Sequence, residues 1–271
     1  MRGTSQRSLS SVWSRFAPVL DAAGNGSSAL GEQLFTVLDA LDSSSALKRG
    51  LADPARPGAD KVALVRSLLA EGFDARVVDV VTWLVEERWT ADADLAEAVE
   101  HLAVASVLVE ARSRDALVTV EEELFTIMRG LVGSREARSA LTAHGVTPAD
   151  RGRLLDQVLA GRGDAATQTL ARRAATHPRG RRFVATLTWY SEIGADLRGE
   201  LVGLVTTSVP FTETQADRLG RLLADTYGKK VRLNFVVDPT VLGGLRVQVG
   251  ADVIDATVLS RMTDARRRMA S

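Results

Sequence analysis

Residues of the kinds that carry catalysis or bind metals are few in this chain, and they are scattered. The sequence has no cysteine, which excludes disulfides, thiolate metal sites, iron–sulfur clusters and a cysteine nucleophile. Its three histidines, His101, His144 and His177, are far apart, and none has a partner at metal-ligand spacing. We therefore expect surface or helix-capping histidines, no metal site and no cofactor.

Two short segments superficially suggest ligand binding. Glu121, Glu122 and Glu123 are adjacent, but consecutive helical residues point in different directions around the axis, which favours a solvated face over a cation site. The Gly-Lys pair in Tyr227-Gly228-Lys229-Lys230 lies in a predicted turn, and no Gly-x-x-x-x-Gly-Lys-Ser/Thr loop is present. Without a paired constellation of titratable groups, an enzyme with an unrecognised site is only a distant alternative.

Binding to another protein is the chemistry that the remaining side chains favour. The densest basic cluster comprises Arg172, Arg173, Arg179, Arg181 and Arg182. Such a cluster either docks on phosphate or an acidic subunit surface, or is a solvated loop near a helix C-terminus. Tryptophan often anchors interfaces, although core packing is its commoner role. From these two signals we predict a partner interface at Trp13, Phe16, Arg179, Arg181 and Arg182.

Composition limits the classes of partner. Thirty-four Lys and Arg residues balance thirty-four Asp and Glu residues, so whole-chain charge gives no support for nucleic-acid binding. The first twenty residues are polar and lack the apolar core of a signal peptide. No stretch approaches about 18 uninterrupted apolar residues, so we expect membrane association only through partners.

Proline and glycine placement predicts a mainly helical chain. We expect amphipathic helices at residues 5–22, 28–42, 59–71 and 73–88, and a second series at 132–144, 148–161, 163–176 and 180–198. Between them, apolar residues at three-and-four spacing predict one long helix from Leu95 to Arg129, about 50 Å in length, with Asp94 and Glu97 capping its start. Thr147, Pro148 and Asp150 form a strong start signal for another helix.

The two helical series resemble each other at a fixed offset. The segment from Leu34 to Leu41 recurs ninety positions later, from Leu124 to Leu131. The same offset relates residues 59–61 to 149–151 and four apolar positions in 64–70 to those in 154–160. Leu- and Ala-rich helices agree by chance at times, but the register persists without a gap for nearly forty residues. We interpret the pattern as an internal helical repeat.

Beyond Gly199 the period of the apolar pattern changes. Residues 200–209, 231–237, 245–249 and 253–254 read as strands, and Thr212 with Gln215 forms a capping box for a helix between the first two. A final helix is expected after Thr257. The prediction is an α+β, mainly α chain divided at 1–94 (helical bundle), 95–131 (long linking helix), 132–198 (second repeat and linker) and 199–271 (β-α-β-β-α domain).

The C-terminal segment resembles a known family. The run from Asp238 to Gly250, followed by Val253-Ile254-Asp255 and Arg261, is similar to the signature of ATP synthase delta subunits and the oligomycin-sensitivity-conferring protein. Its motif residues, which we expect to be structural, are Asp238, Pro239, Gly243, Gly244, Gly250, Asp255 and Arg261. Two departures are Ala256, where the family usually has glycine, and about ninety additional residues, which the repeat explains.

The resemblance implies a mechanical function without catalysis. It implies a stator subunit that holds the N-terminal helices of the alpha subunits and joins the b subunit of the peripheral stalk, so that rotor torque does not spin the catalytic head. It also implies a place on the cytoplasmic face of the cell membrane. The alternative is a helical-repeat regulatory scaffold that binds partner helices. Which copy of the repeat meets the alpha subunits is left open.

Overall fold

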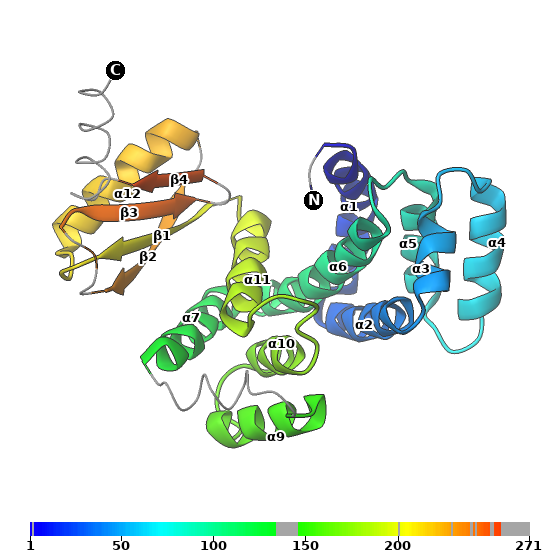
Figure 1. Cartoon of the computed structure of the whole chain (residues 1–271), viewed down its shortest axis with the longest axis horizontal. Coiled ribbons are helices and arrows are strands. Elements are labelled where there is room, and N and C mark those ends of the chain that lie inside the picture. The colour runs from blue at the N-terminus through cyan, green and yellow to red at the C-terminus, as the bar shows by residue number, and fades with distance from the viewer. Residues whose placement is uncertain are drawn as a thin grey trace, which may run out of the picture. The chain divides into compact units, whose positions relative to one another are not determined.

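A computed structural model describes residues 1, 3–133, 146–199, 201–228, 230–238, 241, 243–249 and 252–255. The chain forms two compact units. Unit 1 comprises Met1–Leu124 and Ala143–Gly180, and unit 2 comprises Phe125–Thr142 and Arg181–Ser271. The predicted α+β class is confirmed, because the described chain is mainly helical and its four strands all follow residue 200 (Figure 1).

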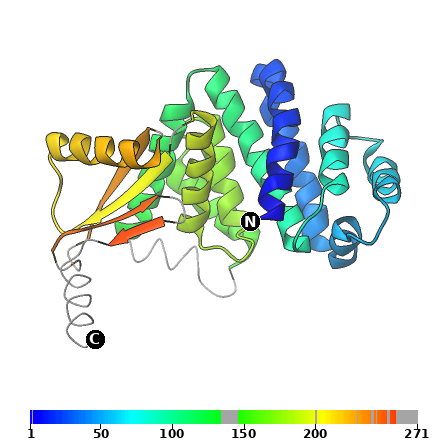
Figure 2. The ribbon, with the colours of Figure 1, turned by 90° about the horizontal axis from the view of Figure 1, so that it is seen from above.

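Unit 1 is built of helices. They are α1 (Thr4–Ala23), α2 (Ser27–Ser43), α3 (Ser45–Ala52), α4 (Gly58–Leu69), α5 (Ala75–Glu86), α6 (Asp92–Ser113), the start of α7 (Leu117–Gly133), α9 (Pro148–Leu159) and α10 (Ala165–Thr176). A short 3-10 turn, η1 (Gly24–Gly26), joins α1 to α2. The first helices, coloured blue to cyan, lie side by side in both ribbon views (Figures 1 and 2).

The single long helix predicted over 95–129 is wrong. The chain breaks at Arg114–Ala116, where Asp115 has a φ of 56°, so α6 and α7 are separate helices. Neither glycine nor proline marks this break, and Asp is one of the few other residues that enter the left-handed region readily. The predicted cap is also wrong, because Ala91 is the N-cap of α6 and the Asp94 carboxylate instead accepts a 2.6 Å hydrogen bond from Ser5.

Helix α6 is the centre of unit 1. Fourteen of its residues are buried, and they lie on all sides of the helix. It contacts α1, α2, α3 and α5, and on another side it contacts α10. A helix that is apolar all round belongs inside a core. The sequence pattern therefore marked a central helix, where we had expected a linking one.

The internal repeat is visible in the helix boundaries. Helices α2, α4 and α5 begin at 27, 58 and 75 and end at 43, 69 and 86, and α7, α9 and α10 begin and end ninety positions later in each case. We call α2, α4 and α5 the first copy, and α7, α9 and α10 the second copy. The α6–α7 break falls ninety positions after η1. Helix α3 escaped prediction, and the predicted helix over 132–144 lies mostly outside the described residues.

One tertiary hydrogen bond recurs with the same offset. In the first copy, the backbone N–H of Asp74 donates to the Gln33 side chain at 2.7 Å. In the second, the N–H of Asp164 donates to Glu123 at 2.8 Å. Each aspartate also caps the next helix, by accepting from the N–H two residues on. This agreement between different side chains supports duplication over chance.

Unit 2 contains the end of α7, helix α11 (Phe183–Leu197) and a small sheet with α12 (Glu213–Tyr227). The strands β1 (Leu201–Thr207), β2 (Val231–Val237), β3 (Leu245–Val249) and β4 (Asp252–Asp255) have the order β2-β1-β3-β4. β1 and β2 are parallel, with α12 as their crossover, and the other pairs are antiparallel. The predicted capping box of Thr212 and Gln215 is confirmed. The final helix expected after Thr257 lies outside the described residues.

Candidate partner-binding surfaces

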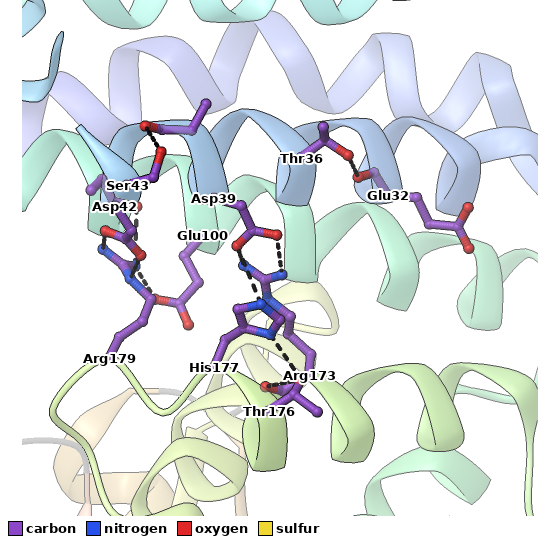
Figure 3. Close-up of polar contacts among 12 residues, drawn as sticks. Glu32, Thr36, Asp39, Asp42, Ser43, Glu100, Arg173, Thr176, His177 and Arg179 are labelled. Carbon is purple, nitrogen blue, oxygen red and sulfur yellow. Dashed lines mark hydrogen bonds and ion pairs between the residues drawn. The ribbon is translucent and has the colours of Figure 1, made fainter. Parts of the chain in front are cut away.

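The end of α10 carries part of the predicted basic cluster, and the structure turns it toward the first copy (Figure 3). The two terminal nitrogens of Arg173 donate to the two carboxylate oxygens of Asp39 at 2.9 and 2.5 Å. The Arg173 guanidinium also lies 4.6 Å from the centre of the Phe35 ring, and the side chain is only 9% exposed. Burial, and then the neighbouring Arg173 cation, lower the pKa of His177 below 6.5. This is a bidentate, charge-assisted contact within unit 1.

Arg179 is engaged in the same way. Its guanidinium bonds Asp42 at 2.7 Å and Glu100, which is 1% exposed, at 2.5 Å. The backbone of Arg179 has a φ of 48°, so the turn after α10 is fixed in the left-handed region. The structure thus gives Arg179 a role between the copies, while a partner contact through it stays a prediction.

The other two predicted arginines belong to unit 2. The Arg181 guanidinium lies 4.5 Å from the centre of the Trp189 ring, a cation–π contact on α11. Arg182 precedes the first residue of α11 and is exposed. Of the basic residues we singled out, Arg182 is therefore the one most available to a partner.

The predicted aromatic pair on α1 splits between core and surface. Phe16 is fully buried in unit 1. Trp13 is half-buried and packs edge-on against the His101 ring at 6.4 Å between centres. Burial lowers the pKa of His101 to about 4, so the imidazole is neutral at neutral pH. Only Trp13 of the pair reaches the surface.

The C-terminal motif is where the sequence predicted backbone chemistry most directly. Gly243 and Gly244 have φ values of 64° and 83°, which confirms the expected left-handed backbone. The Asp238 N–H donates to Thr207 at 2.8 Å and joins the end of β2 to β1. Asp255 ends β4 opposite Arg246. Pro239, Gly250 and Arg261 lie outside the described residues.

Sequence reasoning missed a groove in unit 2. It has a volume of about 610 Å³ and lies between α7, α11 and the strands β1 and β2. It also missed the acidic partners Asp39, Asp42 and Glu100. The ninety-residue offset was the available signal for part of this, because it pairs Phe125, Met128 and Arg129 of the groove lining with Phe35, Leu38 and Asp39 of the first copy.

Other kinds of site find no support in the part of the chain that is described. No group of three His, Asp or Glu side chains there is placed to hold a metal ion. Within the same residues, no helix has the length and apolar character needed to cross a membrane.

Comparison with known proteins gives a consistent set of matches. The family model for the ATP synthase delta (OSCP) subunit matches residues 103–269, which begin inside α6 and include the second copy and the sheet. The chain is 45% identical to ATP synthase subunit delta of Beutenbergia cavernae over 270 residues, covering 100% of both chains. It is 38% identical to the subunit of the same name from Streptomyces coelicolor, covering 100% of this chain and 99% of that one.

Among solved structures, the chain is similar to one chain of the Toxoplasma gondii mitochondrial ATP synthase hexamer. The TM-score is 0.39 with 18% sequence identity, and the match covers 62% of this chain and 96% of that one.

Proposed function

The chain belongs to the ATP synthase delta (OSCP) subunit family, and from that premise we propose that its two units hold two different parts of the enzyme. It is a non-catalytic stator subunit of the F-type ATP synthase, and it belongs to the membrane-bound complex through its partners. The proposal concerns what each unit binds, and it places the chain on the cytoplasmic face of the membrane.

Unit 1 holds the N-terminal helices of the alpha subunits on the catalytic head. A surface made only of helices offers grooves that suit an amphipathic helix. The half-buried Trp13 on α1 is the anchor we assign to this contact, and its ring packs edge-on against His101. Replacement by Ala is expected to weaken head binding while leaving stalk binding unchanged.

Unit 2 joins the b subunit of the peripheral stalk. The observation that carries this assignment is that the C-terminal motif folds as a sheet within a unit of its own, apart from the first copy of the repeat. A subunit that resists torque needs two separate grips, and two compact units supply them. Arg182, exposed at the start of α11, is included in this surface.

The test uses the paired glycines. Gly243→Val and Gly244→Val each place a β-branched residue at positive φ, with a strain of about 1–3 kcal/mol. We expect the sheet to loosen while the helical unit stays folded, so that b-subunit binding falls, head binding persists, and ATP hydrolysis is uncoupled from proton pumping. Undiminished b-subunit binding by both variants would contradict the assignment of unit 2. Loss of head binding alone would mean that the two units are assigned in reverse.

A further inference from the structure

The groove in unit 2 is lined mainly by apolar side chains, with Thr206, Asn234 and Asp238 also in its lining. Met128 on α7 is 7% exposed, while Val237 at the end of β2 is 46% exposed. Phe125 and Val184 are half-buried in the walls, and Thr188 donates to the Met128 sulfur at 3.4 Å. A volume of about 610 Å³ leaves room for several apolar side chains of a partner.

The corresponding surface of the first copy is already covered. The residues ninety positions before Phe125, Met128 and Arg129 are Phe35, Leu38 and Asp39. Phe35 is 6% exposed and Leu38 is fully buried. Arg173 of α10 lies over the Phe35 ring and forms two hydrogen bonds with the Asp39 carboxylate. On this surface, an arginine side chain from α10 meets the acid beside the aromatic ring.

The second copy has the same apolar residues with the opposite charge. Arg129 stands where the first copy has Asp39, and it is exposed. Its guanidinium lies 5.9 Å from the centre of the Phe125 ring. Among the described residues no acid forms an ion pair with Arg129. The surface therefore complements a helix that offers a carboxylate where α10 offers an arginine.

We propose that this groove binds an amphipathic helix of another chain, with its apolar face against Phe125, Met128 and Val237 and a carboxylate on Arg129. The proposal rests on the assignment of unit 2 to partner binding and specifies the chemistry of the partner. Apolar anchors supply the affinity of such a contact, and the ion pair selects the partner and its register.

The experiment uses the full-length chain and a probe derived from the first copy. The probe is a side-chain-stapled, fluorescent helix with the sequence of α10, Ala165–Thr176, made with either Arg or Glu at the position of Arg173. Fluorescence anisotropy should show that the Glu version binds about fivefold more tightly than the Arg version. With Arg129→Glu, the order of the two affinities should reverse. Arg218→Glu, an exposed arginine on α12 outside the groove, is the matched control and should leave the order unchanged.

Equal affinities for the two probes, or an order that survives Arg129→Glu, would overturn the proposal. Binding that appears only after residues 256–271 are removed would assign the groove to the chain's own C-terminal segment and overturn it as well. No other ATP synthase subunit is present in this assay, so its result does not depend on which subunit each unit binds. A parallel measurement of b-subunit binding to the wild-type chain tests that function separately. If the wild-type chain fails to bind the b subunit while Arg129→Glu still reverses the order of the two probe affinities, the proposed function fails and the groove chemistry stands.

Discussion

The first and second copies of the helical repeat have equivalent helix boundaries, but one equivalent surface is covered in the first copy and borders a groove in the second. In the first copy, Phe35 and Asp39 are covered by Arg173 from α10. In the second, Phe125 and Arg129 border a groove. The boundaries survive with few identical residues because caps and apolar spacing set them, whereas the charge at positions 39 and 129 is reversed. The two copies therefore share an architecture and carry opposite charges at one equivalent position.

The largest expected effect comes from giving the first copy the charge of the second. Asp39→Arg removes the partner of Arg173, which is 9% exposed, and sets a like charge beside it. We expect the free energy of unfolding to fall by about 2–4 kcal/mol, less than for a fully buried pair because Asp39 is partly exposed. Chemical denaturation measures this loss.

The reciprocal change supplies the control. Arg129→Asp alters an exposed residue at the equivalent position and should change stability by no more than about 0.5 kcal/mol. Combining Asp39→Arg with Arg173→Asp should restore more than half of the loss. Equal effects of the two single changes would show that the copies do not differ at this surface.

The second prediction concerns the close crossing of α2 and α6. A Cβ at Gly31 would lie 2.8 Å from the backbone oxygen of Ala103, so Gly31→Ala forces the two helices apart. We expect a loss of about 1–3 kcal/mol, measured by thermal unfolding. At Gly130 nothing lies within 4 Å, and the first copy already has Ala40 at that position. Gly130→Ala should therefore stabilise the protein by about 0.5–1 kcal/mol, and a loss of stability there would contradict the equivalence.

The third prediction concerns the repeated hydrogen bond. Gln33→Leu and Glu123→Leu each leave the backbone N–H of the following helix cap without its acceptor, at a cost of about 1–3 kcal/mol. We expect the Glu123 variant to lose more stability than the Gln33 variant. The Glu123 carboxylate also accepts a 2.5 Å hydrogen bond from Thr167, and hydrogen bonds to a carboxylate are stronger than those to an amide oxygen. Hydrogen exchange of the Asp74 and Asp164 amides should report each loss locally. A larger loss at Gln33 would reverse this ranking.

The smallest expected effect is a pH dependence of the two helix caps. Hydrogen bonds from Arg76 lower the pKa of Asp74 from 3.8 to about 2, and those from Arg114 lower the pKa of Asp164. When folding lowers the pKa of a carboxyl group, the group stabilises the folded state at any pH above its unfolded pKa. This stabilisation is lost as the pH falls through the folded pKa. Between pH 4 and pH 2 we expect each cap to lose at most about 1 kcal/mol, given solvent screening. Asp74→Asn should flatten the Asp74 part of this slope; an unchanged slope would contradict its assignment.

Much of the fold could be predicted from local chemistry. The features that we failed to predict depend on residues far away in the sequence. Caps such as Thr147 and Thr212, and the positive φ at Gly243 and Gly244, are encoded within a few residues. The break at Asp115 has no glycine or proline of its own to mark it. Only the equivalent turn at Gly24–Gly26, ninety positions earlier in the repeat, indicates that a break should occur there. The partners of Arg173 and Arg179 are set by tertiary packing, and no local spacing predicts a contact between residues so distant in sequence. The predicted interface at Trp13 and Arg182 stays a prediction.

Helix α6 packs against α2 and α5 of the first copy, against α1 and α3 beside them, and against α10 of the second copy. Neither copy has a complete inner wall of its own. Deleting the first copy at its natural ends would strip α6 of most of its cover, and deleting the second would uncover its other side. The repeat can be shortened cleanly only by excising ninety consecutive residues that begin at one boundary and end at its equivalent, for example 24–113, which lets α1 take the place of α6.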